Sequence, residues 1–223
     1  MENTIPLSQK LYLLGIHPEK GGLTYRSYTA MDYIIMGSLL MELYRDKKIR
    51  FEAKRIVVLT TKADTELHRF ILEKMNKYRS PRKISYWINK FNSSMRYIRG
   101  EVQSGLIEKR LIRVLSKRFL FFRWRKPELV NKQALIRLKT EIERQIFYGT
   151  TNEDELIFLS FLEPGGFLFR MFPDKHKRKQ AKLKLKEMMV ENRVSSAVAD
   201  AISAAQAVAA SVAVSAAVSS SAS

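Results

Sequence analysis

The stretch from Thr29 to Arg45 restricts the fold of this chain more than any other segment. Its apolar side chains recur at the spacing of an α-helix, and they cover more than half of the helical cylinder. A helix of this kind must be buried on most of its sides, so other elements have to surround it. We therefore expect a central helix over residues 29–45 in a mainly α-helical domain.

Further helices are predicted by apolar periodicity and by Ser, Asn and Pro at their ends, at about 7–16, 64–78, 82–91, 94–109, 131–147, 152–162 and 174–192. Residues 49–52 and 55–59 predict a small β-hairpin. The β-rich run from 112 to 125 predicts a second hairpin, with its turn at Ser116-Lys117. The expected fold class is mainly α, a single globular helical domain with two β-hairpins.

The C-terminal segment, residues 195–223, consists mostly of Ala, Ser and Val, and Asp200 is its only charged residue. It is long enough for a membrane span. However, Ala is near neutral for membrane insertion, and Asp200, Gln206 and several Ser interrupt the apolar residues. We interpret it as one or two small-residue helices packed on the body or as a partly ordered tail. The expected division is a body over 1–194 and this segment over 195–223.

The charge of the chain indicates what kind of partner it binds. Forty Lys and Arg against 22 Asp and Glu give a net charge of +18, which favours nucleic acid, anionic lipid head groups or an acidic protein. The chain has no Cys and only three His, so thiol chemistry is excluded and a His-built metal site is disfavoured. The N-terminal residues lack the apolar core of a signal peptide, which predicts a cytoplasmic protein.

Motifs of the common enzyme classes are absent from the sequence, namely the phosphate-binding GxxxxGK[ST], the dinucleotide-binding GxGxxG, the nucleophile elbow GxSxG and the zinc-binding HExxH. Asp64 and Glu66 fit the first turn of a helix, where carboxylates favour the helix dipole. His68 follows on that helix beside Arg69, and we expect it to be a surface residue. The sequence predicts a protein without enzymatic activity, cofactor or metal.

Basic and aromatic side chains alternate in the second predicted hairpin. In one extended strand, Phe119, Phe121, Arg123 and Arg125 would face one way and Trp124 the other. The hairpin could be half buried with its charges solvated. Alternatively, its exposed rings and arginines could mediate self-association or contact with a membrane interface. The Lys-rich stretch at 174–186 is typical of a solvated helix that raises the positive potential.

Two arginines stand out on the helix predicted from residue 94. At about 100° per residue, Arg96, Arg99 and Gln103 lie along one flank of its apolar stripe. Two guanidinium groups one turn apart can bind one phosphate. They could equally pair with carboxylates on neighbouring helices, and spacing alone leaves both readings open.

Several blocks of sequence resemble the Golgi phosphoprotein 3 family in order and spacing over about residues 5–190. They are LYLLGIHPEKGG, IIMGSLLMELYRDKKIRFE, MRYIRGEVQSGLIEKRLI and FLFFRWRKPEL. The resemblance implies a mostly α-helical, non-enzymatic, peripheral-membrane domain that binds phosphatidylinositol 4-phosphate. In eukaryotes the family is known to tether glycosyltransferases at Golgi membranes. The implied partners are therefore an anionic phospholipid surface and client membrane proteins.

This chain keeps some of the residues with which the family binds the lipid head group and replaces others. Its two phosphate-binding arginines correspond to Arg96 and Arg99, whereas a third arginine corresponds to Met36. The family's loop tryptophan falls within residues 25–28, where the resemblance implies that Tyr28 or Arg26 takes its place. The protruding hairpin that the family uses for self-association corresponds to residues 112–125.

Two alternatives remain at this stage. A helix, the residues GLIEKR and two basic strands are similar to the recognition helix and wing of a winged helix-turn-helix, which would bind DNA phosphates. The strands are too aromatic for a solvated wing, so nucleic acid is the less favoured partner. The other alternative is an adaptor for acidic proteins that binds no lipid.

Overall fold

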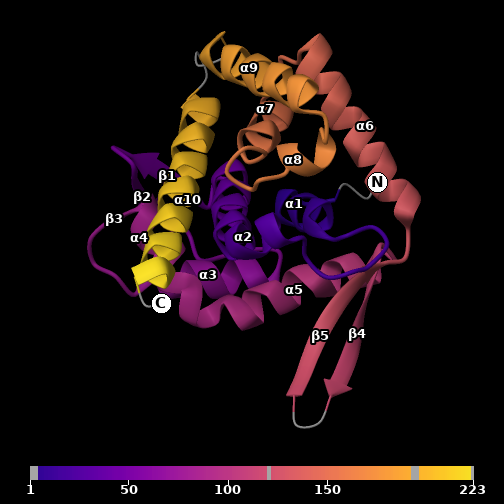
Figure 1. Cartoon of the computed structure of the whole chain (residues 1–223). Helices are drawn as coiled ribbons and strands as arrows, with labels where there is room; N and C mark the ends of the chain where they lie inside the picture. Colours follow the sequence, from indigo (N-terminus) through magenta and orange to yellow (C-terminus); the bar gives the residue numbers. More distant parts are fainter. Residues whose placement is uncertain (1–4, 120–121, 192–195, 222–223) are drawn as a thin grey trace.

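The computed structural model of the chain describes residues 5–119, 122–191 and 196–221 (Figure 1). The side chains of residues 25–26, 29, 117–119, 122–124, 196–198, 201 and 213–221 lie outside this description. Helices make up most of the described chain, and the strands form two small antiparallel sheets. The predicted mainly α fold with two hairpins is confirmed.

Helix α2 (Tyr25–Arg45) is the central element. Helices α1 (Leu7–Gly15) and α10 (Ser196–Ser221) pack along it, and Figure 1 shows α2 enclosed by the other helices. The side chains of Met31, Ile35 and Leu40 on its successive turns are fully or almost fully buried, which confirms the prediction of a helix surrounded on most sides. Helix α2 begins four residues before the predicted start.

The other helices lie within a few residues of the predicted ranges. They are α3 (Glu66–Asn76), α4 (Ile84–Lys90), η1 (Phe91–Ser94), α5 (Met95–Glu108), α6 (Lys132–Tyr148), α7 (Glu153–Ser160), α8 (Leu168–Met171) and α9 (Lys175–Glu191). The short helix α8 was not predicted. Side-chain oxygens cap four of these helices, because Thr65, Asn131, Asn152 and Asp174 each accept a hydrogen bond from a backbone N–H in the first turn.

The first sheet contains β1 (Ile49–Glu52), β2 (Arg55–Val58) and β3 (Arg82–Lys83) in the order β1-β2-β3. The first two strands are the predicted hairpin. The two residues of β3 add a third strand, which the sequence analysis assigned to the start of a helix.

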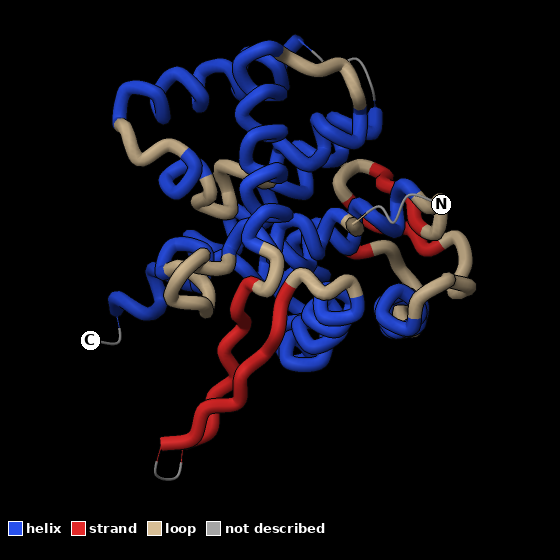
Figure 2. The backbone as a smooth tube through the Cα atoms, turned by 90° about the vertical axis from the view of Figure 1, so that its right-hand side faces the viewer, coloured by secondary structure: helices blue, strands red, loops and turns tan. Residues whose placement is uncertain are grey.

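The second sheet is a hairpin of β4 (Ile112–Phe119) and β5 (Phe122–Leu129), which extends away from the helices (Figures 1 and 2). The predicted turn at Ser116-Lys117 is wrong, because β4 continues through both residues and the register pairs Phe119 with Phe122. Phe119 and Arg123 therefore belong to different strands, and their placement in one continuous strand is wrong as well.

The loop between α1 and α2 fastens the base of this hairpin to the helices. The backbone N–H of Gly22 donates a hydrogen bond to the carbonyl of Pro127 in β5, at 2.6 Å. Gly21 has a φ of +65°, and a Cβ at this position would lie 2.9 Å from the Pro127 carbonyl oxygen. Glycine is therefore required for the hairpin to lie this close to the loop.

Helix α10 packs against α2, α4 and α7 through small residues. Ala204, Ala205 and Val208 are buried, and a Cβ on Gly37 of α2 would lie 2.7 Å from the Val208 side chain. Burial raises the pKa of Asp200, against a smaller lowering by its hydrogen bond with Tyr44. None of the described helices combines the length and hydropathy that crossing a membrane requires. The division of the chain after residue 194 stays a prediction.

Candidate functional site

Helix α5 holds the two predicted phosphate-binding arginines. Its apolar residues Met95, Ile98, Val102 and Leu106 are buried and fix the helix against the core. Arg96 and Arg99 follow one another by three residues along the flank of that stripe, as the helical spacing predicts. Their surroundings differ, however, because Arg96 is exposed and Arg99 is half-buried.

Arg99 is held by a carboxylate of the central helix. Its Nε and Nη2 both donate to Oδ1 of Asp32 in α2, at 3.1 and 2.5 Å. The two side chains are 34% and 30% exposed, so the pair lies at the edge of the core. Burial lowers the pKa of the Arg99 guanidinium, but the hydrogen bond and charge of Asp32 together leave that pKa raised, so the group stays cationic.

A second polar contact lies beside this ion pair. Gln103, one turn after Arg99, donates from Nε2 to the hydroxyl of Tyr12 in α1 at 2.6 Å. Both side chains are buried. Burial raises the pKa of the Tyr12 hydroxyl, against smaller lowering effects from Gln103, Arg99 and Arg125. The flank of α5 is thereby fastened to both α1 and α2.

Arg96 makes no ion pair or hydrogen bond with the residues that the structure describes. Tyr28, in the first turn of α2, is 66% exposed, and it lies close enough to Arg99 to contribute to the raised pKa of that guanidinium. The side chain of Arg26 lies outside the described residues. Met36, where the family has a third arginine, is fully buried in the core and contributes no contact at this surface.

The hairpin residues are only partly described. Arg125 is exposed in the middle of β5, and its charge slightly lowers the pKa of the Tyr12 hydroxyl, which burial raises. The register pairs Lys117 with Trp124 and Arg118 with Arg123, but these four side chains, like that of Phe119, lie outside the described part of the chain. Phe121 lies outside it altogether. Whether the rings are exposed therefore stays a prediction.

The sequence analysis missed two partners of this site, Asp32 and Tyr12. Asp32 is the only charged residue between Thr29 and Met41, in a helix that is otherwise apolar or neutral there. A lone charge at the edge of a buried helix indicates a partner of opposite charge, so this signal was available. Tyr12 gave no comparable signal, because a tyrosine within an apolar helix is typical of the core.

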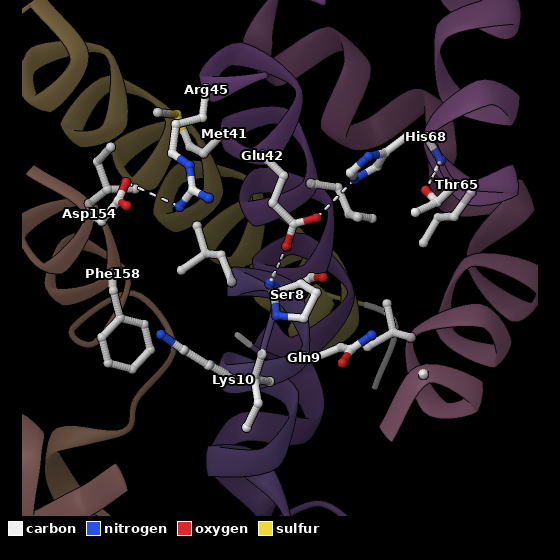
Figure 3. A pocket seen from close by; sticks show the side chains of 18 of the residues that line it. Ser8, Gln9, Lys10, Met41, Glu42, Arg45, Thr65, His68, Asp154 and Phe158 are labelled. Carbon is white, nitrogen blue, oxygen red and sulfur yellow. Dashed lines mark hydrogen bonds and ion pairs between the residues drawn. The ribbon is translucent and has the colours of Figure 1, made fainter. Parts of the chain in front are cut away.

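The opposite flank of α5 lines a cavity, drawn in Figure 3. At its centre Glu42 of α2, which is buried, accepts a hydrogen bond from the backbone N–H of Ser8 at 2.7 Å. Nε2 of His68 lies 2.9 Å from the other carboxylate oxygen, and the His68 side chain is only 12% exposed. The prediction that His68 is a surface residue is therefore wrong. Its ring contacts Glu42 of α2, a partner 26 residues away that the sequence around His68 does not indicate.

The basic flank of α5 offers cationic hydrogen-bond donors. Its donors are guanidinium groups, and these bind phosphate through paired hydrogen bonds. Among the described residues, no group of three or more His, Asp or Glu could hold a metal ion.

A search of curated proteins gives no match to this chain. A comparison with protein families matches residues 7–205 to the family described as Golgi phosphoprotein 3 (GPP34). The matched range runs from the start of α1 into α10 and includes both flanks of α5 and the whole hairpin. Because this match covers most of the chain, the protein belongs to the Golgi phosphoprotein 3 family.

Proposed function

We propose that this protein binds anionic phospholipid head groups at a membrane surface, through Arg96 and Arg99 on helix α5. Membership in the Golgi phosphoprotein 3 family is consistent with a lipid-binding adaptor role. The observation that carries the proposal is an exposed arginine without a described partner, one turn from an arginine whose position is fixed by Asp32.

The pairing of Arg99 with Asp32 is compatible with phosphate binding. Asp32 takes the Nε and Nη2 donors, whereas Nη1 makes no hydrogen bond with the described residues. A guanidinium held on one side loses little conformational freedom when its other side binds a phosphate. Arg96 then supplies a second cation from the same flank. Asp32 acts in this arrangement as the residue that orients Arg99.

The charge of the chain supports the same function over a longer range. The net charge of +18 attracts the protein to an anionic leaflet, where each Lys or Arg near the surface contributes about 1 kcal/mol. The head group that we propose is phosphatidylinositol 4-phosphate, which the resemblance to the Golgi phosphoprotein 3 family implies, and its monoester phosphate carries more charge than a phosphodiester. We further propose that the protein acts without catalysis, as an adaptor for client membrane proteins.

The test is a vesicle co-sedimentation series with the double variant Arg96→Ala/Arg99→Ala. The vesicles contain phosphatidylcholine alone, with phosphatidylserine, or with phosphatidylinositol 4-phosphate. Each hydrogen bond to a charged phosphate contributes about 1.5–3 kcal/mol, so we expect the double variant to lose at least about tenfold in affinity for the phosphoinositide vesicles. Arg96→Ala alone should lose part of this affinity with an unchanged melting temperature, because Arg96 has no described partner to lose.

The matched control is Lys175→Ala/Lys179→Ala, which removes the same charge from exposed positions on α9. It should weaken vesicle binding much less than the α5 variant. Equal losses in the two variants would contradict a site on α5 and indicate binding by net charge alone. Tighter binding to duplex DNA than to any vesicle would contradict the lipid proposal itself.

We also propose that the hairpin at 112–125 mediates self-association or contact with the membrane. This proposal is supported by the extension of β4 and β5 away from the helices (Figure 2) and by the exposure of Arg125 in the middle of β5. Light scattering of the purified chain would contradict self-association if the mass were that of a monomer at all concentrations.

A further inference from the structure

The cavity of Figure 3 has the size of a small-molecule site. Its volume is about 630 Å³, which lies within the usual range of ligand pockets. It is bounded by α1, the C-terminal part of α2, the start of α3, α5, α6 and α7. It is separate from the arginine flank, because α5 turns its other side toward it.

The charge of the cavity is opposite to that of the chain. Eight carboxylates line it, against three Lys or Arg and one His. The carboxylates belong to Glu42, Asp46, Glu66, Glu101, Glu108, Glu141, Asp154 and Glu155. More than a third of the 22 acidic residues of a strongly basic protein are thus gathered around one cavity. Because salt screens surface charges beyond about 8 Å, a cation at this position is affected chiefly by these carboxylates.

Part of this negative charge has no partner within the protein. Glu101, Glu108 and Asp46 make no ion pair with the residues that the structure describes. The cationic side chain of Lys10 enters the cavity, but its Nζ lies near the ring of Phe158, 6.0 Å from the centroid, and makes no described ion pair (Figure 3). The carboxylates therefore exceed the cations that the chain itself provides.

A second, independent observation comes from two buried amides in the wall. The side-chain oxygens of Gln145 and Gln9 are buried and accept no hydrogen bond in the described structure. Gln145 is only 4% exposed, and its Nε2 donates to Glu141 at 2.9 Å, which fixes the orientation of the amide. A buried acceptor without a donor costs free energy. Both residues line the cavity, so a ligand with N–H groups is a candidate donor for these oxygens.

The amide of Gln9 packs closely against helix α5 in the cavity wall. A Cβ on Gly105 of α5 would lie 2.1 Å from Nε2 of Gln9, so the amide reaches the helix only because residue 105 is glycine. The wall also contains apolar side chains, which include Leu39, Val102 and Ile142. Carboxylates and amide oxygens are thus separated by hydrocarbon surface.

We infer that this cavity binds a linear aliphatic polyamine. The ammonium groups of such a molecule donate to carboxylates and amide oxygens, and the methylene chain between them packs on the apolar wall. A basic peptide fits less well, because its backbone carbonyls are further acceptors in a lining where carboxylates already outnumber cationic donors. The inference does not depend on lipid binding, since the two sites use opposite flanks of α5.

The experiment is isothermal titration calorimetry of the full chain with spermidine, without lipid and at physiological salt. We expect saturable binding, weaker for putrescine because it has one ammonium group fewer. The variant Glu101→Gln/Glu108→Gln should lose about tenfold in spermidine affinity, since each partly exposed ion pair contributes up to about 1 kcal/mol. These two residues have no described partner, so their replacement should leave the melting temperature nearly unchanged.

The matched control is Glu73→Gln/Glu191→Gln, which removes two carboxylates from exposed positions outside the cavity and should change the affinity less than twofold. Gln145→Leu should lower spermidine affinity, whereas an unchanged affinity would overturn the role of its oxygen. Non-saturable heats, equal losses in the control, or saturable binding of a Lys-rich peptide but not of spermidine would each overturn the inference. Arg96→Ala/Arg99→Ala should bind spermidine as the wild type does, which separates this result from failure of the lipid proposal.

Discussion

Helix α5 carries arginines on one flank and carboxylates on the other. At about 100° per residue, Glu101, Gly105 and Glu108 lie 120–180° around the helix from Arg96. On the arginine flank Asp32 is the one described anion paired with Arg99, and donors are in excess. On the carboxylate flank acceptors are in excess, including the buried oxygen of Gln145. The net charge of +18 therefore does not describe the carboxylate flank, and a single helix separates a cationic surface from a cavity lined by carboxylates.

The largest expected effect concerns the contact that fastens the arginine flank to α1. Tyr12→Phe removes the acceptor of the 2.6 Å hydrogen bond from Gln103 and leaves a buried amide N–H without a partner. We expect the free energy of unfolding to fall by about 1–3 kcal/mol, measured by urea denaturation. Tyr148→Phe, at an exposed position, is the control and should have no measurable effect.

The same variant has a pH dependence of known sign. Burial is the main influence on the Tyr12 hydroxyl and raises its pKa in the folded state, whereas an unfolded tyrosine ionises near pH 10. The stabilisation by neutral Tyr12 is complete below about pH 10 and is lost as the pH rises toward the folded-state pKa. The difference in stability between wild type and Tyr12→Phe should therefore narrow above pH 10. A difference that stays constant would mean that the hydroxyl is not buried as described.

The architecture was largely predictable from the sequence, and the contacts of the two flanks were not. Local periodicity is sufficient to place α2 and α5, because each helix shows its own apolar stripe. The pairs Arg99–Asp32 and Gln103–Tyr12 join residues 67 and 91 positions apart. Spacing along one helix shows which residues share a flank, but it does not show which residues of other helices lie opposite.

Local sequence patterns gave wrong predictions at two places, the turn of the second hairpin and the burial of His68, where contacts between distant residues determine the structure. The turn of the second hairpin was predicted at Ser116-Lys117, between two β-rich runs, but strand pairing continues to Phe119. His68 was expected at the surface because charged residues surround it in sequence. Its ring is instead enclosed by the contact with Glu42, which belongs to another helix.

The next prediction distinguishes lipid binding by the arginine flank from lipid binding by the net charge of the chain. Asp32→Asn removes the ion pair of Arg99 and keeps the size of the side chain. The pair is about a third exposed, so we expect a loss of about 1–2 kcal/mol in stability, between the values for exposed and buried pairs. The amide oxygen of the Asn side chain can still accept from Arg99 and orient it, so the main change at the site is the loss of a negative charge. We therefore expect the affinity for phosphoinositide vesicles to rise about threefold, measured by co-sedimentation.

The matched control for Asp32→Asn is Asp154→Asn. Asp154 pairs with Arg45 at 3.1 Å on the cavity side, so the variant makes the same change in charge far from the arginine flank. It should change vesicle affinity less than Asp32→Asn does. If both variants raise it equally, the vesicles respond to total charge and the two flanks do not differ in lipid binding.

The smallest expected effect concerns Lys10, the cation that the chain itself places among the carboxylates of the cavity. Lys10→Met keeps an apolar chain of similar length beside Phe158 and removes one positive charge. Two charges several ångströms apart near a protein surface repel by roughly 0.5–1 kcal/mol once solvent screening is included, so spermidine affinity should rise about two- to fivefold. Lys175→Met makes the same change at an exposed position on α9 outside the cavity and should raise it much less. Vesicle affinity should fall equally and only slightly in both variants, because neither lysine belongs to the arginine flank. A rise in spermidine affinity of the same size in both variants would mean that spermidine responds to the overall charge, and the cavity would then have no separate role in binding cations.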